Sequence, residues 1–361
     1  MSRKKLMILV ILMLIPMKST GQNQAEAISS PFTAQLEPIE FGFRFDDNVY
    51  RSVSANGRFS DGIYLLNAGG TLGFHWDVFR GDLRYRLGAD QYQLYSSVSN
   101  LKNNFTLFLV SEPGPFSFYY KNEVYLRNSQ YSDFDYSDLE NLLGASWSPG
   151  GFWNYGLSYK NYSREYYDKT DAYQSRNFVD QALLLNVQRE IDEKFSLKME
   201  GGYNNRQFNR NAVASNATTI LSSIHTDETW TLLLNAHLYF ESVLQDINFE
   251  EQRTNSNSYG FSNSVQSVSW AAVVRPVSSL YLQLFFRLYS KNYDVTPLNL
   301  PDLQVGFLDE DNQDLLSIRT TWEWSPQWMA SIGISRARSE SSQPGQYYIK
   351  NILSAQVRRN F

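Results

Sequence analysis

Apolar and polar side chains alternate along most of this chain. The clearest stretch is LYLQLFFRLYSK at 280–291, where a leucine or phenylalanine stands at every second position from Leu280 to Leu288. Successive side chains of a β-strand point to opposite faces of its sheet. The stretch therefore predicts a strand with one apolar and one polar face, and LLSIRTTWEW at 315–324 and FSLKMEGGYN at 195–204 predict two more.

Two kinds of connection alternate between these segments over most of the chain. Short ones such as EPGP at 112–115 and IDEK at 191–194 carry turn residues, and long polar ones such as 294–314 follow them. This alternation is typical of a membrane β-barrel with tight turns at one rim and long loops at the other. The predicted strands cover roughly 38–50, 71–80, 82–96, 102–111, 115–128, 138–148, 152–166, 178–190, 195–208, 227–240, 243–255, 263–275, 280–293, 313–324, 328–340 and 346–361.

The predicted fold is thus an all-β, antiparallel, up-and-down transmembrane barrel of about 16 strands over 38–361, preceded by a periplasmic segment at 22–37. An even strand number places both termini in the periplasm. Between Val49 and Gly70 the pattern fits either one long loop or an extra hairpin, which leaves 14 or 18 strands as alternatives.

The chain ends on QYYIKNILSAQVRRNF, and the alternation continues to the final residue. Together with the strand pattern over nearly all of 38–361, this ending resembles bacterial outer-membrane β-barrels of the porin-like class. The resemblance implies a location in the outer membrane of a Gram-negative bacterium, contact with its lipid, and insertion by the barrel-assembly machinery. It implies that Phe361, Val357 and Leu353 form the assembly signal, while Arg359 departs from the usual apolar residue.

Composition disfavours several other classes of protein. Aromatic residues make up 15 % of the chain while the mean hydropathy is only -0.41, which disfavours a bundle of membrane helices. The absence of cysteine removes thiolate metal sites and cysteine nucleophiles, and a net charge of -5 without a basic run disfavours nucleic acid as a partner. Residues 1–21 combine basic MSRKK with apolar LMILVILMLIPM, and they predict a signal peptide cleaved near Gly21 or Gln22.

If the apolar faces contact lipid, the polar faces line the interior. The predicted pore-lining residues are Arg84, Arg86, Lys121, Arg127, Lys160, Lys198, Arg287, Arg319 and Glu323. Two interpretations of this charged interior stay open: an electropositive wall that conducts anionic or polar solutes, or pairs such as Arg319 with Glu323 that cancel locally and brace the barrel. Interior tyrosines such as Tyr125, Tyr162 and Tyr281 fit a track for carbohydrate, or simply the preference of tyrosine for strands.

The predicted function is a passive channel for polar or anionic solutes, with no metal or cofactor. In this channel we expect the apolar Leu298, Leu303 and Phe307 of the 294–314 loop to fold inward and form a constriction. One alternative is an accessory barrel of a polysaccharide or protein export system, in which the same three residues contact a partner. The other alternative is an enzyme. We do not expect catalysis, because His75, His225 and His237 show no spacing typical of a nucleophile or a metal site.

Overall fold

The computed structural model describes residues 32–47, 60–96, 99–129, 135–150, 152–167, 177–215, 219–294, 314–339 and 348–361. Its strands are β1 (Phe32–Leu36), β2 (Ile39–Asp46), β3 (Asp61–Trp76), β4 (Phe79–Tyr92), β5 (Asn100–Ser111), β6 (Phe116–Ser129), β7 (Tyr136–Trp147), β8 (Trp153–Tyr166), β9 (Phe178–Asp192), β10 (Phe195–Val213), β11 (Ile220–Phe240), β12 (Val243–Ser256), β13 (Asn263–Val277), β14 (Leu280–Tyr293), β15 (Asp314–Ser325), β16 (Trp328–Ser339) and β17 (Tyr348–Arg359). No helix in these ranges is long and apolar enough to cross a membrane.

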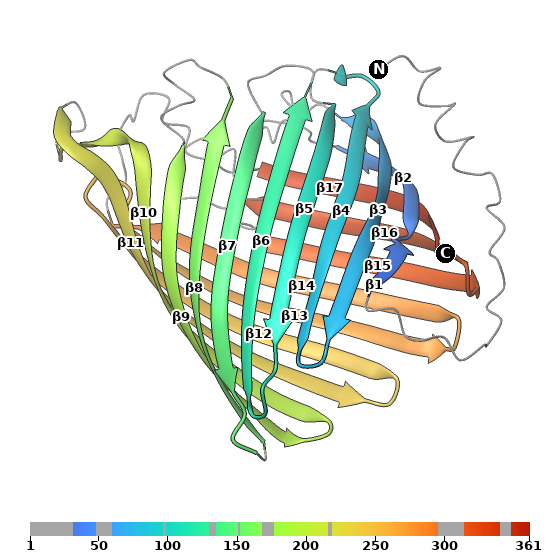
Figure 1. Cartoon of the computed structure of the whole chain (residues 1–361). Coiled ribbons are helices and arrows are strands. Elements are labelled where there is room, and N and C mark those ends of the chain that lie inside the picture. Colours follow the sequence, from blue (N-terminus) through green and yellow to red (C-terminus); the bar gives the residue numbers. More distant parts are fainter. Residues whose placement is uncertain are drawn as a thin grey trace. The chain divides into compact units, whose positions relative to one another are not determined.

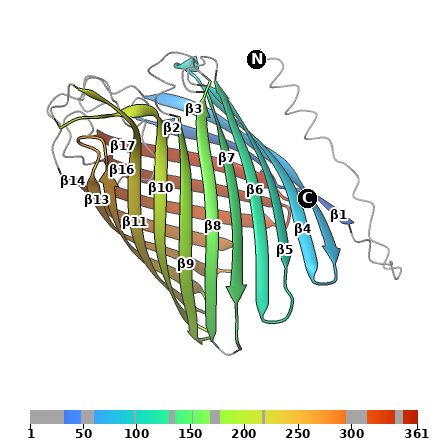
Figure 2. The ribbon, with the colours of Figure 1, turned by 60° about the vertical axis from the view of Figure 1, so that its left-hand side comes forward.

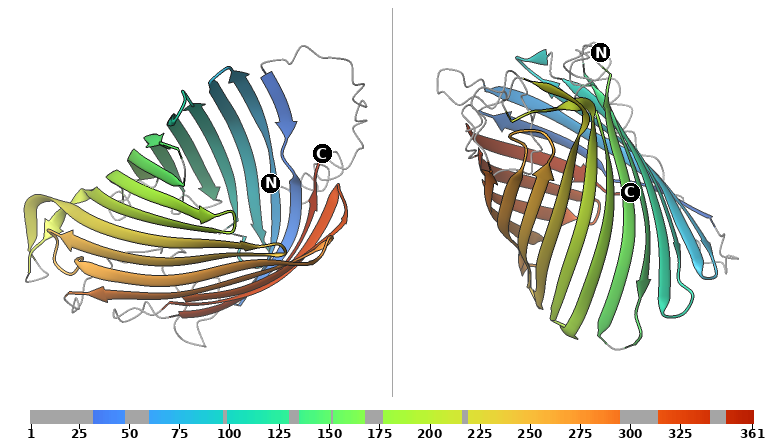
Figure 3. Two further views of the ribbon diagram at one scale, coloured as in Figure 1. Left: turned by 90° about the horizontal axis from the view of Figure 1, so that it is seen from below. Right: turned by 90° about the vertical axis from the view of Figure 1, so that its left-hand side faces the viewer.

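Sixteen of the described strands, β2 to β17, form a closed antiparallel ring (Figure 1). Each strand pairs with the next along the chain, and β17 pairs with β2 to close the ring, with Val357 opposite Phe41. The turns that join β3 to β4, β5 to β6 and β9 to β10 lie at one end (Figure 2). Seen from below, β3 to β8 lie opposite β12 to β16 across the interior (Figure 3). The predicted all-β barrel of about 16 strands is confirmed.

Aromatic side chains gather on the apolar face beside the short turns. Phe116 stacks on Trp147 with ring centroids 6.5 Å apart, and Trp147 contacts Tyr155 at 5.7 Å. On the other side of the barrel the rings of Trp324 and Trp328 stack at 6.2 Å. Such a girdle marks a membrane–water interface, so the short turns lie at one edge of the apolar belt.

The first hairpin differs from the prediction. We expected strands at 71–80 and 82–96, but β3 begins at Asp61 and the turn falls at Asp77–Val78, with Asp77 in the left-handed region at φ 45°. Gly81 lies within β4, where a Cβ atom would stand 2.2 Å from Cζ of Phe74. Gly81 therefore makes room for an aromatic ring and does not form the turn. The ambiguous stretch before Gly70 is, from Asp61 onward, the first half of β3.

The predicted long connection between the strands at 195–208 and 227–240 is also largely wrong. Strand β10 continues to Val213 and β11 already begins at Ile220. The polar, asparagine-rich composition there hid a hairpin whose strands lack an apolar face. These two strands are the longest that the structure describes, with 19 and 21 residues.

β1 and β2 are two halves of one broken strand. Leu36 pairs with Gly70 and Glu40 with Asn67, both on β3, so β1 and β2 together contain one more residue than β3 over this interval. This is a β-bulge, and it reverses the alternation of faces. Glu37 and Glu40 are three residues apart, yet both reach the polar face. Residue 38, where we expected the barrel to begin, lies between β1 and β2.

Candidate functional site

The polar face of the sheet is its inner face. Cross-strand partners share a face: Leu284 pairs with Ile318 on the apolar face, and Arg319 pairs with Gln283 on the polar one. Two cavities among the described residues are lined mainly by polar-face side chains of several strands. A concave surface shared by many strands of a closed barrel is its interior. All nine predicted pore-lining residues lie on this face by their register.

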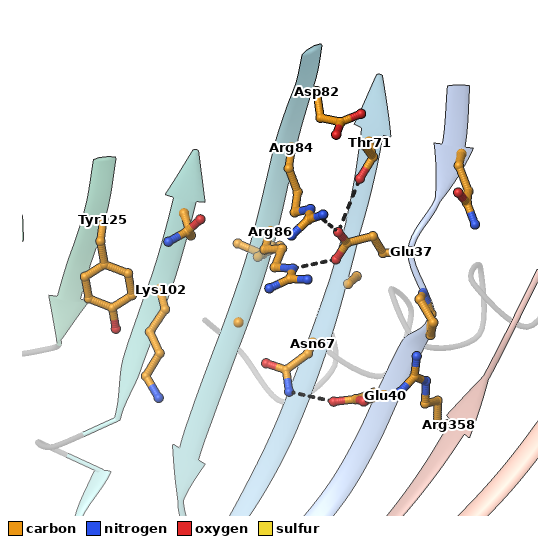
Figure 4. A pocket seen from close by; sticks show the side chains of 16 residues that line it. Glu37, Glu40, Asn67, Thr71, Asp82, Arg84, Arg86, Lys102, Tyr125 and Arg358 are labelled. Atoms are coloured by element: carbon orange, nitrogen blue, oxygen red, sulfur yellow. Dashed lines mark hydrogen bonds and ion pairs between the residues drawn. The ribbon is translucent and has the colours of Figure 1, made fainter. Parts of the chain in front are cut away.

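The larger cavity, of about 730 Å³, lies against β2 to β6 and centres on Glu37 (Figure 4). The bulge turns Glu37 inward, and its backbone N–H donates to the carbonyl of Gly69 at 3.0 Å. The carboxylate of Glu37 forms ion pairs with Nε of Arg84 at 3.0 Å and Nε of Arg86 at 2.6 Å. Thr71 donates its hydroxyl to the same carboxylate at 3.3 Å. One carboxylate from the N-terminal strand thus holds two predicted pore-lining arginines.

A second cavity, of about 290 Å³, adjoins the first through two shared residues, Glu40 and Arg358. The carboxylate of Glu40 lies 3.7 Å from Nη1 of Arg358 and accepts a hydrogen bond from the amide of Asn67 at 3.3 Å. Arg319 and Tyr281 line its far wall. Polar cavities therefore follow the inner wall from β6 through β2 to β14.

The inner wall of β6 to β8 carries its charges in adjacent pairs. Nζ of Lys121 lies 2.5 Å from Glu123 and 3.0 Å from Glu140, and Nζ of Lys160 lies 3.3 Å from the other oxygen of Glu140. Lys198 pairs in the same way with Glu200 at 2.9 Å. These contacts favour local cancellation of charge over a uniformly electropositive wall.

The expected pair of Arg319 with Glu323 is wrong. The two residues stand four apart on β15, about 13 Å along a strand. Glu323 instead accepts a hydrogen bond from the hydroxyl of Tyr281 at 3.3 Å. The pairs that do form mostly join neighbouring strands, because side chains directly opposite each other are the ones close enough to touch.

Several acidic partners were missed from the sequence. Asp138 and Glu140 alternate within YSDLENLL and could have been placed inside from the predicted strand at 138–148. Asp180, near the start of β9, likewise stands at a polar position of the predicted strand at 178–190. The sequence pattern does not indicate that both Glu37 and Glu40 point inward, because that arrangement depends on the bulge.

His225 is fully buried at the ends of β10 to β13, where we had expected a loop. Its Nδ1 accepts a hydrogen bond from Nε of Arg210 at 3.0 Å, and Nε2 lies 2.9 Å from Asp227 and 3.1 Å from the hydroxyl of Ser256. A catalytic triad needs its acid and its serine at opposite ring nitrogens. Here both are at Nε2, so the arrangement does not fit a triad.

The proposed assembly signal lies at the closing seam. Leu353 and Val357 pair with Phe45 and Phe41 of β2 on the apolar face. The guanidinium of Arg359, which departs from the usual apolar residue, lies 5.5 Å from the ring centre of Trp328 and 5.1 Å from that of Phe361. Its position between two rings explains how a cation is accommodated there.

Two further expectations concern the constriction loop and metal binding. Leu298, Leu303 and Phe307 of the expected constriction lie outside the described residues. Within the ranges that are described, no group of three or more histidine and acidic side chains is arranged to hold a metal ion.

No family model and no curated protein sequence matches the chain. An outer membrane protein of Vibrio cholerae, OmpT with loop L8 deleted, aligns with 92 % of this chain and 100 % of its own at 8 % identity and a TM-score of 0.50. A BenF-like porin from Pseudomonas fluorescens Pf-5 aligns with 91 % of this chain and 99 % of its own at 11 % identity and a TM-score of 0.49. An anion-selective porin from Comamonas acidovorans aligns with 91 % of this chain and 100 % of its own at 11 % identity and a TM-score of 0.48. At these identities the likeness shows the fold alone, which is that of outer-membrane β-barrels, as predicted.

Proposed function

We propose that this protein is a passive channel for polar solutes in the outer membrane of a Gram-negative bacterium, exported by its signal peptide. The observation that carries the proposal is the inner wall: adjoining polar cavities of about 730 and 290 Å³ run beside charges that are paired in place. Barrels of this strand number generally enclose an aqueous channel. Charges of both signs facing water are stable there, whereas a dry core would penalise them heavily.

The paired charges support polar solutes over anions. An anion-selective wall needs cations that lack carboxylate partners, yet Lys121, Lys160 and Lys198 each contact a glutamate. The field of such pairs falls off quickly with distance, so the wall attracts neither sign of ion strongly. We further propose that the short-turn end, where β17 ends, faces the periplasm.

Planar-bilayer recording of the purified, folded protein tests the channel. The expected result is a steady current at low voltage, with a reversal potential close to zero in a KCl gradient. A folded protein that gives no current contradicts the proposal, and a strongly anion-selective current contradicts its charge argument.

A second candidate, an accessory barrel that binds another protein, is favoured by the position of β1. One edge of β1 pairs with β3, all five residues of β1 are exposed, and no register with a second strand is found for β1 among the described residues. A free strand edge is a template for adding a strand from a partner. A photo-crosslinking amino acid at Ala34 in the native host tests this: a discrete crosslinked protein supports a partner, and none supports the channel alone.

A further inference from the structure

A row of aromatic rings crosses the inner wall of β6 to β10, near the strand ends that the long connections join. We call these six rings the aromatic band: Tyr125, Tyr136, Tyr162, Tyr166, Phe178 and Phe208. Their strands lie side by side (Figure 1). Tyr125 also lines the larger cavity around Glu37, so the band begins where that cavity ends (Figure 4).

The rings form two runs of close neighbours. Tyr125 and Tyr136 have ring centroids 5.9 Å apart, and Tyr136 and Tyr166 are 5.7 Å apart. On the next strands the distances are 5.7 Å from Tyr162 to Phe178 and 5.9 Å from Phe178 to Phe208. Five neighbouring strands span roughly 20 Å. All six rings are partly exposed on the inner face.

Arginines lie over the rings and are themselves held by aspartates. The guanidinium of Arg164 lies 4.3 Å from the ring centre of Tyr136 and makes two hydrogen bonds to Asp138, at 2.8 and 2.9 Å. The guanidinium of Arg206 lies 4.2 Å from the ring centre of Phe178 and makes two to Asp180, at 2.7 and 2.8 Å. These bidentate contacts fix each guanidinium plane and cancel its charge.

This combination favours one class of ligand. Ring faces and edges offer apolar contact to the C–H faces of a sugar, while guanidinium N–H groups donate hydrogen bonds to its hydroxyl oxygens and carboxylate oxygens accept hydrogen bonds from its hydroxyl groups. An anion would have to displace an aspartate from its arginine to gain the same charge. A purely apolar ligand would remove water from the arginine–aspartate pairs without replacing the hydrogen bonds of that water, which is costly.

We propose that the aromatic band binds a linear, uncharged saccharide chain that lies across β6 to β10. The inference rests on the proposed channel, because the band faces the interior and a solute reaches it through the long-connection end. It names the solute class that the channel takes. At its β10 end the band adjoins the buried cluster around His225, whose ring lies 4.4 Å from Phe208, so this end of the band is rigidly held.

Calorimetric titration of the folded, full-length protein in detergent tests the proposal without requiring a current. The probes are cellohexaose, maltohexaose, mannohexaose and xylohexaose, with hexagalacturonate as the charged counterpart. At least one neutral chain should bind, and more tightly than hexagalacturonate. No binding by any neutral chain, or tighter binding of hexagalacturonate, would overturn the proposal.

Ring removal locates the site. Phe178→Ala should weaken binding of the neutral chain by about tenfold, and Phe178→Leu should do the same while keeping the apolar volume if the alanine variant fails to fold. Tyr136→Phe keeps the ring and should retain binding to within a few-fold. Phe118→Ala removes a half-exposed ring from the apolar face of β6, opposite to the face that carries the band. It is the matched control and should leave affinity unchanged. Equal affinity in wild type and Phe178→Leu would show that the chain binds elsewhere.

The two proposals can fail separately. If the neutral chain binds in detergent but the bilayer carries no current, the channel is wrong and the saccharide site stands. If the bilayer carries a current that no neutral chain blocks, and calorimetry shows no binding, the band is only a brace between strands.

Discussion

Oε2 of Glu37 lies 2.6 Å from Nε of Arg86, and the contact spans strand β3 from the bulge between β1 and β2 to β4. The same carboxylate pairs with Arg84, so one acidic residue contacts two cations that border the larger cavity. The side chain of Glu37 is only 16 % exposed, whereas those of Arg84 and Arg86 are 41 % and 56 % exposed. We therefore expect the contacts of Glu37 with Arg84 and Arg86 to affect the charge of the inner wall more than the stability of the barrel.

Glu37→Gln should make the channel prefer anions. Removing the carboxylate leaves Arg84 and Arg86 without this partner, while the free energy of unfolding should fall by about 1 kcal/mol at most, since both arginine side chains are about half exposed to solvent. The reversal potential in a KCl gradient measures the change. Glu112→Gln is the matched control, because its pair with Arg80 at 3.0 Å is about half exposed beside a turn. An unchanged reversal potential in Glu37→Gln would remove Glu37 from the conducting path.

Gly81→Ala should destabilise the barrel by about 1–3 kcal/mol, because the new Cβ atom would overlap the ring of Phe74. Denaturant unfolding in detergent measures the loss, and a second substitution, Phe74→Ala, should restore part of it. Gly201→Ala is the control, since a Cβ atom there meets nothing within 4 Å. Equal stability of the two alanine variants would show that Gly81 is not needed for the packing of Phe74.

Leu284→Arg should lower the free energy of unfolding by about 2–4 kcal/mol if Leu284 lies near the bilayer midplane. Leu284 is the fifth of the 14 residues of β14 and pairs with Ile318 on the apolar face. Arg287→Leu, three residues away on the inner face, should fold normally and change only ion selectivity. Refolding into lipid vesicles followed by chemical denaturation compares the two. A stable Leu284→Arg beside an unstable Arg287→Leu would reverse the assignment of faces.

Deletion of Phe361 should reduce the amount of folded, heat-modifiable protein in the outer membrane. Phe361 follows the strand that closes the ring, and its ring lies beside the guanidinium of Arg359. Phe361→Trp preserves a terminal aromatic residue and should assemble normally. If the deletion assembles as well as wild type, Phe361 is not part of the assembly signal.

The chain's alternating pattern was enough to predict the barrel, its approximate strand number and the faces of its central strands. From β5 to β17 most predicted strands agree with the structure to within a few residues. Period-two alternation is a local property, and a one-residue error would move a whole strand's apolar set to the wrong face. The sequence therefore also placed Arg287 and Arg319 on the face opposite Leu284 and Leu316.

Only the tertiary structure decided which charges meet and where the first strands lie. The bulge at Glu37 changes the face of every residue before it, and nothing local distinguishes it from a loop. Gly81 looks like a turn residue until the ring of Phe74 is placed above it. The aromatic band and the arginine–aspartate pairs arise between strands that the sequence separates by long connections, so their geometry depends on register and closure, which are properties of the whole sheet.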